Sequence, residues 1–303
     1  MALGPPKLIE SLRHYDGRTF LADLTAGVTV GLVALPLALA FAISSGLSPQ
    51  SGIYTAVVAG ALISLLGGSR LQIGGPTGAF VVIVAGIVAE HGVNGLFVCT
   101  LMAGVMLVIL GVTGMGSAVR FIPRPVVVGF TNGIAVLIAT THIRDFFGLR
   151  IESVPSEFMA RMEVLAAHAS TWSPSATALA VGTLAVIILT ARVSKRIPGA
   201  ILALCLGTLV VVAFGLEVET IGTRFGGIPS GLPSLQWPTV PMSSLTGLLI
   251  PAMTVAMLGA IESLMSAVVA YRMSGDRHDS NVELVAQGIA NIASPLFGGL
   301  PAT

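Results

Sequence analysis

The sequence contains an acidic residue in the middle of a long apolar run. Glu262 lies between positions 243 and 271, and Ser266 follows it by four residues. Residues four apart share one face of a helix, so the carboxylate and the hydroxyl are predicted to point the same way. A charged carboxylate in hydrocarbon is costly unless it is protonated, paired or coordinated. We therefore predict a proton or hard-cation site at these two residues. The alternative is a structural hydrogen bond that Glu262 accepts from a half-helix amide.

A motif of paired glycine, proline and threonine occurs twice. Residues 74–80 read Gly-Gly-Pro-Thr-Gly-Ala-Phe, and residues 298–303 read Gly-Gly-Leu-Pro-Ala-Thr. Pro and Gly disfavour a continuous helix, so a half-helix is predicted to begin at each motif. The first amides of a helix lack intrahelical acceptors, and the backbone dipole adds a partial positive charge, so such an end attracts an anion.

Recurrence of the motif predicts an inverted repeat whose two half-helices meet at the binding site. The expected anion-lining residues are Thr77 and Gly78 in the first motif and Ala302 and Thr303 in the second. Thr77 could also donate a hydroxyl hydrogen. The alternative is that Gly and Pro merely permit kinks or close helix packing.

The first apolar run offers two further candidates. Leu37 and Phe41 follow Pro36 and lie one helical turn apart, so they share a face. They could form a wall of a pocket, or they could face lipid or pack against other helices.

Composition places the chain in a membrane. The hydrophobic fraction is 54%, the charged fraction is 10% and the mean hydropathy is +0.93, outside the usual range of soluble domains. The net charge of +1 favours no partner class, and we expect no nucleic-acid partner. The sequence has no His-Glu-x-x-His motif, no intramembrane His cluster and no paired carboxylates. These patterns would suggest an enzyme, so no catalytic residue is predicted. His278, between Asp276 and Asp279, is interpreted as part of a helix-capping turn at Asp279, Ser280 or Asn281 rather than as a metal ligand.

Apolar runs of about 20 residues are long enough to cross the hydrocarbon. The predicted segments are 21–45, 51–68, 74–90, 94–116, 123–141, 175–191, 197–215, 243–271 and 281–296. Lys and Arg favour cytoplasmic loops, and a cytoplasmic N-terminus leaves only Arg144, Arg150, Arg161 and Arg224 outside. The cytoplasmic set is then Lys7, Arg13, Arg18, Arg70, Arg120, Arg124, Arg192, Lys195, Arg196, Arg272 and Arg277.

The loops suggest a division of the chain. Positions 1–20 show no signal-peptide pattern and are predicted to be a cytoplasmic segment. Residues 144–175 resemble an amphipathic interfacial helix or an external loop. We predict a first repeat at 21–215, an external linker at 216–242 and a partial second repeat at 243–303.

Together the motifs resemble those of the SulP family of anion permeases. The resemblance runs along the whole chain and is carried by residues 36–42, 46–54, 74–80, 275–281 and 291–303. It implies an all-α polytopic membrane protein with the uracil-permease type of fold, a seven-plus-seven inverted repeat with core and gate domains and elevator-like alternating access. The chain would then stop at the start of segment ten, so we expect it to be truncated, to lack the C-terminal STAS domain and not to transport alone.

The resemblance also assigns roles. Leu37, Phe41 and Thr77 match pocket-lining positions, Glu262 and Ser266 match a segment-eight acid and hydroxyl used for sodium or proton coupling, and Thr303 lies at the edge of the segment-ten contribution. Many members have Gln where this chain has Leu37, which removes a polar contact to the anion.

We therefore predict secondary active transport of a small anion, which would be bicarbonate, sulfate or a dicarboxylate. The coupling ion would be a proton or sodium, and no other cofactor is expected. The alternatives are an anion exchanger, an anion channel or a voltage-responsive membrane motor. The expected location is the inner or plasma membrane as a multi-pass homodimer within the lipid bilayer.

Overall fold

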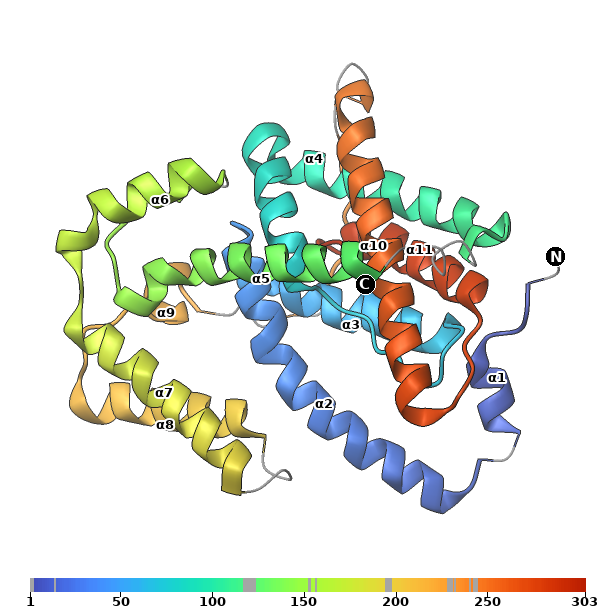
Figure 1. Ribbon diagram of the computed structural model, residues 1–303, viewed down its shortest axis with the longest axis horizontal. Helices are drawn as coiled ribbons and strands as arrows, with labels where there is room; N and C mark the ends of the chain where they lie inside the picture. Colours follow the sequence, from blue (N-terminus) through green and yellow to red (C-terminus); the bar gives the residue numbers. More distant parts are fainter. Residues whose placement is uncertain are drawn as a thin grey trace.

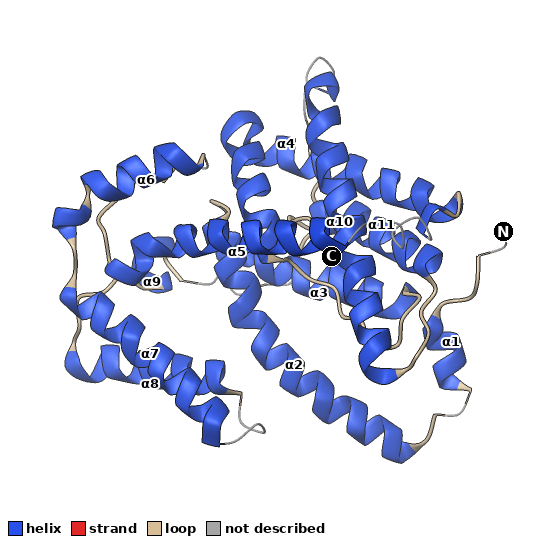
Figure 2. Cartoon of the chain, in the orientation of Figure 1, coloured by secondary structure: helices blue, strands red, loops and turns tan. Residues whose placement is uncertain are grey.

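The structure is a computed structural model that describes residues 3–13, 15–116, 124–151, 154–155, 157–193, 198–227, 231, 233–239, 241 and 245–303. These residues form helices and loops, with no strand among them (Figures 1 and 2). The helices are α1 (Lys7–Leu12), α2 (Gly17–Ser44), α3 (Pro49–Leu66), α4 (Gly78–Val112), α5 (Arg124–Phe147), α6 (Phe158–Ala167), η2 (Ala169–Thr171), α7 (Pro174–Val193), α8 (Gly199–Phe214), α9 (Ile221–Phe225), α10 (Leu245–Ser274) and α11 (Ser280–Leu296). The predicted all-α class is confirmed.

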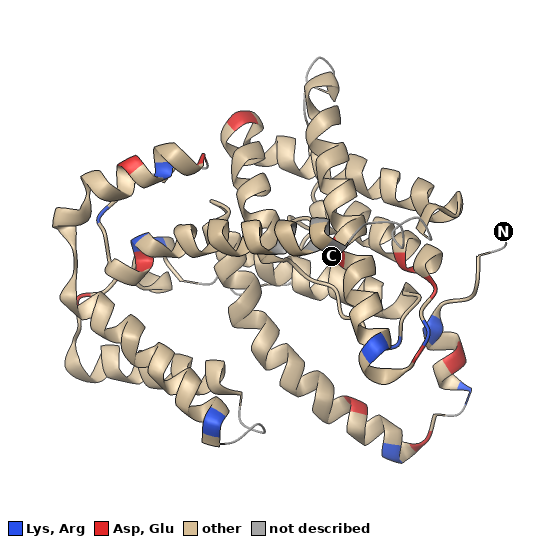
Figure 3. Cartoon of the chain, in the orientation of Figure 1, with Lys and Arg blue, Asp and Glu red and all other residues tan. Residues whose placement is uncertain are grey.

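Five of the described helices are long and apolar enough to cross a membrane, namely α2, α3, α4, α7 and α10, and α8 is a shorter apolar helix. Their middle turns carry few charges, whereas most Lys, Arg, Asp and Glu residues gather near helix ends and loops (Figure 3). This distribution fits helices with apolar centres and polar ends in a bilayer. Arg120, Lys195 and Arg196, which contribute to the predicted orientation, lie outside the described residues.

The predicted segments 74–90 and 94–116 are joined in the structure. Helix α4 covers both and is interrupted at Gly92, whose φ of 70° lies in the left-handed region that glycine adopts without a steric penalty. The first arm also starts later than predicted, at Gly78, because residues 74–77 are not helical. The sequence signal for two segments therefore corresponds to two arms of one kinked helix.

Side-chain caps lie at the start of several described helices, among them α2 and α11. Asp16 accepts a hydrogen bond from the Thr19 amide (2.8 Å) at the start of α2. Asp279 accepts from the amides of Asn281 (2.9 Å) and Val282 (3.2 Å) at the start of α11, which confirms the predicted capping turn. Such bonds satisfy amides that no intrahelical carbonyl reaches.

The core forms where α4 packs against α10 and α11, on the right of Figure 1, and α7 and α8 lie side by side at the lower left. Leu107, Leu248 and Leu284 are buried in this core. A Cβ atom on Gly104 would lie 2.7 Å from the Gly288 carbonyl oxygen, and one on Gly288 would lie 2.6 Å from the Gly104 oxygen. The two backbones are therefore in contact, which fixes α11 against α4.

Two predicted loops have structure of their own. Within residues 144–175, α6 and η2 fold back so that Leu165 packs with Leu149 and Ile151. The segment predicted to be an amphipathic interfacial helix or an external loop thus contains a short α-helix and a single 3-10 turn. The predicted linker at 216–242 contains α9, and the Gln236 amide donates to the Leu296 oxygen (2.6 Å) at the end of α11.

Candidate functional site

The two glycine and proline motifs lie side by side in the structure. The Gly75 amide donates to the Thr303 oxygen, and the Thr303 amide donates to the Gly75 oxygen, each at 3.0 Å. This reciprocal exchange resembles a hydrogen-bonded pair in antiparallel strands. We call residues 74–77 and 300–303 the paired breaks. Sequence reasoning expected these motifs to meet, and the structure brings them together.

The first break ends at Thr77, which caps α4. Its backbone is extended (φ −122°, ψ 154°), and its hydroxyl oxygen accepts from the Ala79 amide at 3.2 Å. Helix α4 then begins at Gly78, so its amino-terminal end lies beside the second break. An end of this kind presents donor groups and the positive end of the helix dipole.

Glu262 of α10 connects the two breaks. Its Oε2 atom accepts a hydrogen bond from the Thr77 hydroxyl at 2.8 Å and from the Thr303 hydroxyl at 3.4 Å. The carboxylate therefore bonds hydroxyl groups, not the half-helix amide considered as the alternative. One oxygen atom thus contacts both halves of the candidate site.

A polar face of α11 holds the second break in place. The Asn291 side chain donates to the Ala302 oxygen and accepts from the Ala302 amide, both at 2.9 Å. The Gln287 side chain also donates to the Ala302 oxygen, and the Ser294 hydroxyl donates to the Leu300 oxygen at 2.6 Å. Gln287, Asn291 and Ser294 are almost completely buried. These bonds satisfy the extended backbone, which has no strand or helix of its own.

Helix α3 contributes a further contact. The Thr55 hydroxyl accepts from the Leu300 amide at 2.6 Å and donates to the Ser51 oxygen at 2.6 Å. Sequence reasoning missed Thr55 and the polar face of α11. A signal for the α11 face was present, because Gln287, Asn291 and Ser294 recur at helical spacing within the segment 281–296.

The predicted anion-lining residues have different environments. A Cβ atom at Gly78 would lie 3.3 Å from the Phe41 ring and 2.6 Å from Ile138 of α5, so the start of α4 is closely covered by both side chains. Leu37 is 48% exposed. Ala302 is fully buried, and its amide and carbonyl are both bonded to α11. Phe41 and Gly78 therefore lie together, whereas Ala302 is part of the scaffold.

Ser266 lies near Glu262, as its spacing predicted. Both residues line a cavity of about 60 Å³, together with Thr303. No hydrogen bond joins the Ser266 hydroxyl to the carboxylate among those found in the described chain. Ser266 thus shares the cavity, and its predicted role in ion coupling stays a prediction.

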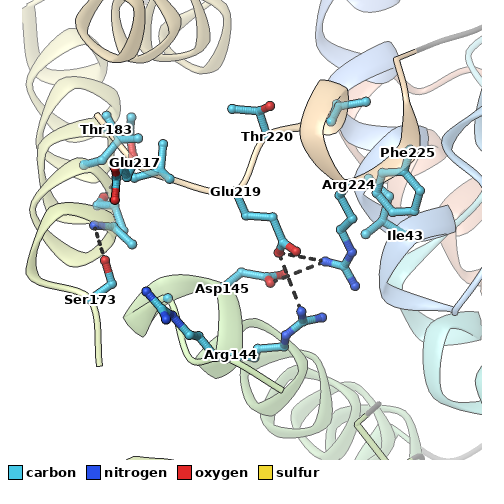
Figure 4. Close-up of a pocket in the computed structure, with 17 residues that line it drawn as sticks. Ile43, Arg144, Asp145, Ser173, Thr183, Glu217, Glu219, Thr220, Arg224 and Phe225 are labelled. Carbon is cyan, nitrogen blue, oxygen red and sulfur yellow. Dashed lines mark hydrogen bonds and ion pairs between the residues drawn. The ribbon is translucent and has the colours of Figure 1, made fainter. Parts of the chain in front are cut away.

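A larger cavity, of about 470 Å³, lies near the ends of α5 and α7 and beside α9 (Figure 4). Arg224 lies 3.3 Å from Glu219 and 3.8 Å from Asp145, and Arg144 lies 3.6 Å from Glu219. These opposite charges compensate one another locally. None of the predicted site residues lines this cavity, so we assign the candidate site to the paired breaks.

Comparison with known proteins gives matches over nearly the whole chain. The model of the sulfate permease family matches residues 20–303. The putative sulfate transporter YvdB of Bacillus subtilis (strain 168) is 48% identical over 292 residues, which cover 96% of this chain and 55% of YvdB. The bicarbonate transporter BicA of Picosynechococcus sp. (strain ATCC 27264 / PCC 7002 / PR-6) is 33% identical over 294 residues, which cover 93% of this chain and 51% of BicA. The chain spans about half the length of these curated relatives.

Solved structures show the same fold. The transmembrane domain of a cyanobacterial bicarbonate transporter BicA superposes with a TM-score of 0.86 at 34% identity, covering 95% of this chain and 75% of that domain. SLC26A9 superposes with a TM-score of 0.83 over 98% of this chain and 51% of its own, and its 17% identity makes this a likeness of fold alone. The family model, the two relatives and the shared fold all agree with the motifs at the paired breaks. The chain therefore belongs to the sulfate permease family.

Proposed function

We propose that the protein is a secondary active transporter of a small anion, driven by a proton or sodium gradient. Bicarbonate, sulfate and dicarboxylates are the substrate class, and two relatives are named as bicarbonate and putative sulfate transporters. The observation that carries the proposal is the hydrogen bonding of Glu262 Oε2 to threonines of both breaks. A titratable or cation-binding group in this position can link ion binding to the anion site.

The anion binds at the start of α4. The amino-terminal end of a helix carries roughly half a positive charge and unpaired amides, which suffice for an oxyanion without a buried Lys or Arg. Phe41 covers this end, and Thr77 and Gly78 form it. Because such a site recognises negative charge and hydrogen-bond acceptors, it suits several small oxyanions.

Electrostatics supplies the coupling. An ionised Glu262 is hydrogen-bonded to Thr77, the residue that caps α4. Two unit charges about 5 Å apart at an effective dielectric of about 20 repel by about 3 kcal/mol. That energy corresponds to a roughly hundredfold change in anion affinity. Proton or sodium binding at Glu262 and Ser266 removes the repulsion, so the anion and the cation bind together.

Alternating access completes the cycle. We propose that α2, α3, α4, α10 and α11 form the core of an elevator-type transporter and that α5, α7 and α8 belong to the gate. The first repeat is 21–215, the linker 216–242 and the partial second repeat 243–303. The protein is placed in the cell membrane as a homodimer with its N-terminus in the cytoplasm.

The test is anion uptake by the full-length protein in liposomes, with pH and sodium gradients imposed separately and labelled bicarbonate and sulfate as substrates. Glu262→Gln is compared with wild type and with Glu163→Gln, which changes an exposed carboxylate of α6. We expect one gradient to drive uptake by wild type and Glu163→Gln. Glu262→Gln should bind the anion but lose the response to that gradient.

Two results contradict the proposal. Uptake that ignores both gradients and the Glu262 substitution indicates an exchanger. A current larger than the charge moved by one transport cycle indicates a channel, because a channel passes many ions per opening.

A further inference from the structure

Two adjoining cavities form one amphipathic space beside α7. The first is the cavity of about 470 Å³ near the ends of α5 and α7, which we call the charged cavity (Figure 4). The second, of about 430 Å³, lies between α7 and α8, and we call it the apolar groove because its lining is apolar except for Ser175 and Thr183. Leu179 and Thr183 line both spaces, so they adjoin along α7. No residue of the paired breaks lines either one, so this space is separate from the candidate anion site.

The apolar groove has the depth of one leaflet of a bilayer. Its lining on α7 runs from Ser175 to Val186, and a rise of about 1.5 Å per residue gives this stretch a length of about 16 Å. The hydrocarbon core of a bilayer is about 30 Å thick, so the groove spans about half of it. Leu206 and Val210 of α8 are exposed along the groove. The groove therefore matches one acyl chain in length and in polarity.

The charged cavity lies at the height of the lipid headgroups. Helix α7 is long and apolar enough to cross a membrane, and Ser173 and Ala176 at its start line this cavity. The ends of membrane-spanning helices lie at the interface with water. A lipid whose acyl chain lies in the apolar groove therefore places its headgroup in the charged cavity.

Two opposite charges in this cavity lack a partner. The ion pairs described above compensate two of its arginines and two of its acidic residues. Arg150 and Glu217 also line the cavity, but neither forms an ion pair with a described residue. Glu217 lies with Thr183 on the side of the cavity where α7 runs (Figure 4). The cavity thus offers one unpaired cation and one unpaired anion to a ligand.

A buried donor at the same cavity is also unpaired. Arg144 lines the cavity, and its Nε is one of the few buried side-chain atoms of the described chain without a hydrogen-bond partner. A buried N–H without an acceptor carries a desolvation cost. Phosphate oxygens are strong acceptors for guanidinium groups. The cavity is therefore complementary to a group that carries both a phosphate and an ammonium.

We propose that this space binds one phospholipid with a zwitterionic, primary-amine headgroup, namely phosphatidylethanolamine. The phosphate is held by Arg150 and Arg144, the ammonium donates to the Glu217 carboxylate, and one acyl chain lies in the apolar groove. A primary ammonium has three N–H donors, whereas the methylated amine of phosphatidylcholine has none. The headgroup pairing therefore prefers phosphatidylethanolamine over lipids with the same acyl chains.

The two parts of the space contribute differently to binding. Lipid tails are as apolar as the groove, so moving an acyl chain from the bilayer into it gains little hydrophobic free energy. The groove holds the chain through van der Waals contacts, and the charged cavity supplies the selectivity. A change in the groove should weaken every phospholipid, and a change in the cavity should remove the preference for one headgroup.

The test counts bound lipid on the purified, delipidated full-length protein by native mass spectrometry. Four probes are titrated separately: phosphatidylethanolamine, phosphatidylcholine and phosphatidylglycerol with identical acyl chains, and phosphoethanolamine, which has no chains. We expect one phosphatidylethanolamine per chain, with a half-saturating concentration at least fivefold below that of each other probe.

Three variants separate the headgroup from the groove. Arg150→Gln and Glu217→Gln change exposed residues, so both should fold. A Cβ atom at Gly182 meets no atom within 4 Å, so Gly182→Leu should fold and fill the groove. The matched controls change residues that line neither space and are Arg192→Gln, Glu163→Gln and Gly27→Leu.

We expect Arg150→Gln and Glu217→Gln to raise the half-saturating concentration of phosphatidylethanolamine on the order of tenfold and to remove its preference over phosphatidylcholine. Gly182→Leu should weaken all three phospholipids, and the controls should match wild type. Equal binding of the three phospholipids to wild type and variants would mean ordinary contact with bulk lipid and would overturn the proposal. Tighter binding of phosphatidylglycerol would refute the zwitterionic headgroup, and equal binding of phosphoethanolamine would refute the role of the groove. The absence of any bound lipid would show that another segment of the full-length chain fills the space, which also overturns the proposal.

Discussion

Asn291→Ala is expected to loosen the second break. The Asn291 side chain makes hydrogen bonds to the Gln287 oxygen (2.8 Å), the Ala302 oxygen (2.9 Å) and the Ala302 amide (2.9 Å), and it is 1% exposed. Three buried hydrogen bonds at about 1 kcal/mol each give a loss of about 3 kcal/mol. The Gln287 bond to Ala302 and the Ser294 bond to Leu300 remain and still join the break to α11. We therefore expect a local loss of order at 300–303 together with lower overall stability.

Two measurements check this prediction on the full-length protein in detergent micelles. Equilibrium unfolding followed by circular dichroism gives the change in free energy, and amide hydrogen exchange reports on Ala302 and Thr303 directly. Asn94→Ala is the matched control, because Asn94 is exposed on α4, and surface changes usually stay within about 0.5 kcal/mol. A loss below about 1 kcal/mol with unchanged exchange at 302–303 would refute the assignment of Asn291 as a clamp on the break.

Three further outcomes are expected. Gly104→Ala places a methyl group 2.7 Å from a backbone oxygen of α11 and should cost about 1–3 kcal/mol in unfolding free energy, whereas Gly86→Ala meets no atom within 4 Å and should be neutral or stabilising. The Ala160 amide, with a second amide of α6, holds the pKa of Glu157 below its ordinary value. The stabilisation of α6 by Glu157 is therefore complete above the ordinary pKa of a glutamate and is lost as the pH falls through the lowered pKa. Amide hydrogen-exchange protection of α6, measured against pH, should show this loss. The pH dependence should disappear in Glu157→Gln. Thr77→Val should raise the anion KM in uptake assays while the response to the driving gradient persists.

The helices and the break motifs could be predicted because their signals are local. Apolar runs of about 20 residues specify spans, and Gly75 and Pro76 interrupt the helical pattern within a few positions. Glu262 stands out for the same reason, since a charge within an apolar run needs an explanation. The kink at Gly92 was less visible, because a glycine is compatible with a loop, a kink or a helix.

The contacts that hold the breaks could not be predicted because their partners are distant. Thr55 meets Leu300 across 245 positions, and Glu283 meets Gly68 across 215. Asn291 and Ala302 are only 11 positions apart. They meet because the chain turns back after α11, and this turn depends on tertiary contacts. Sequence periodicity identifies a polar face but does not say which backbone it binds.

Charge and hydrogen bonding at Glu262 can be separated by the two substitutions near it. Glu262→Gln removes the charge and keeps an oxygen that can accept from Thr77, whereas Thr77→Val keeps the charge and removes the 2.8 Å bond. If the charge couples the ion to the anion, only Glu262→Gln loses the response to the gradient. If the hydrogen bond merely positions the start of α4, Thr77→Val impairs anion binding alone. Equal loss of gradient response in both variants would mean that the bond, not the charge, transmits the coupling, and the electrostatic account would then be wrong.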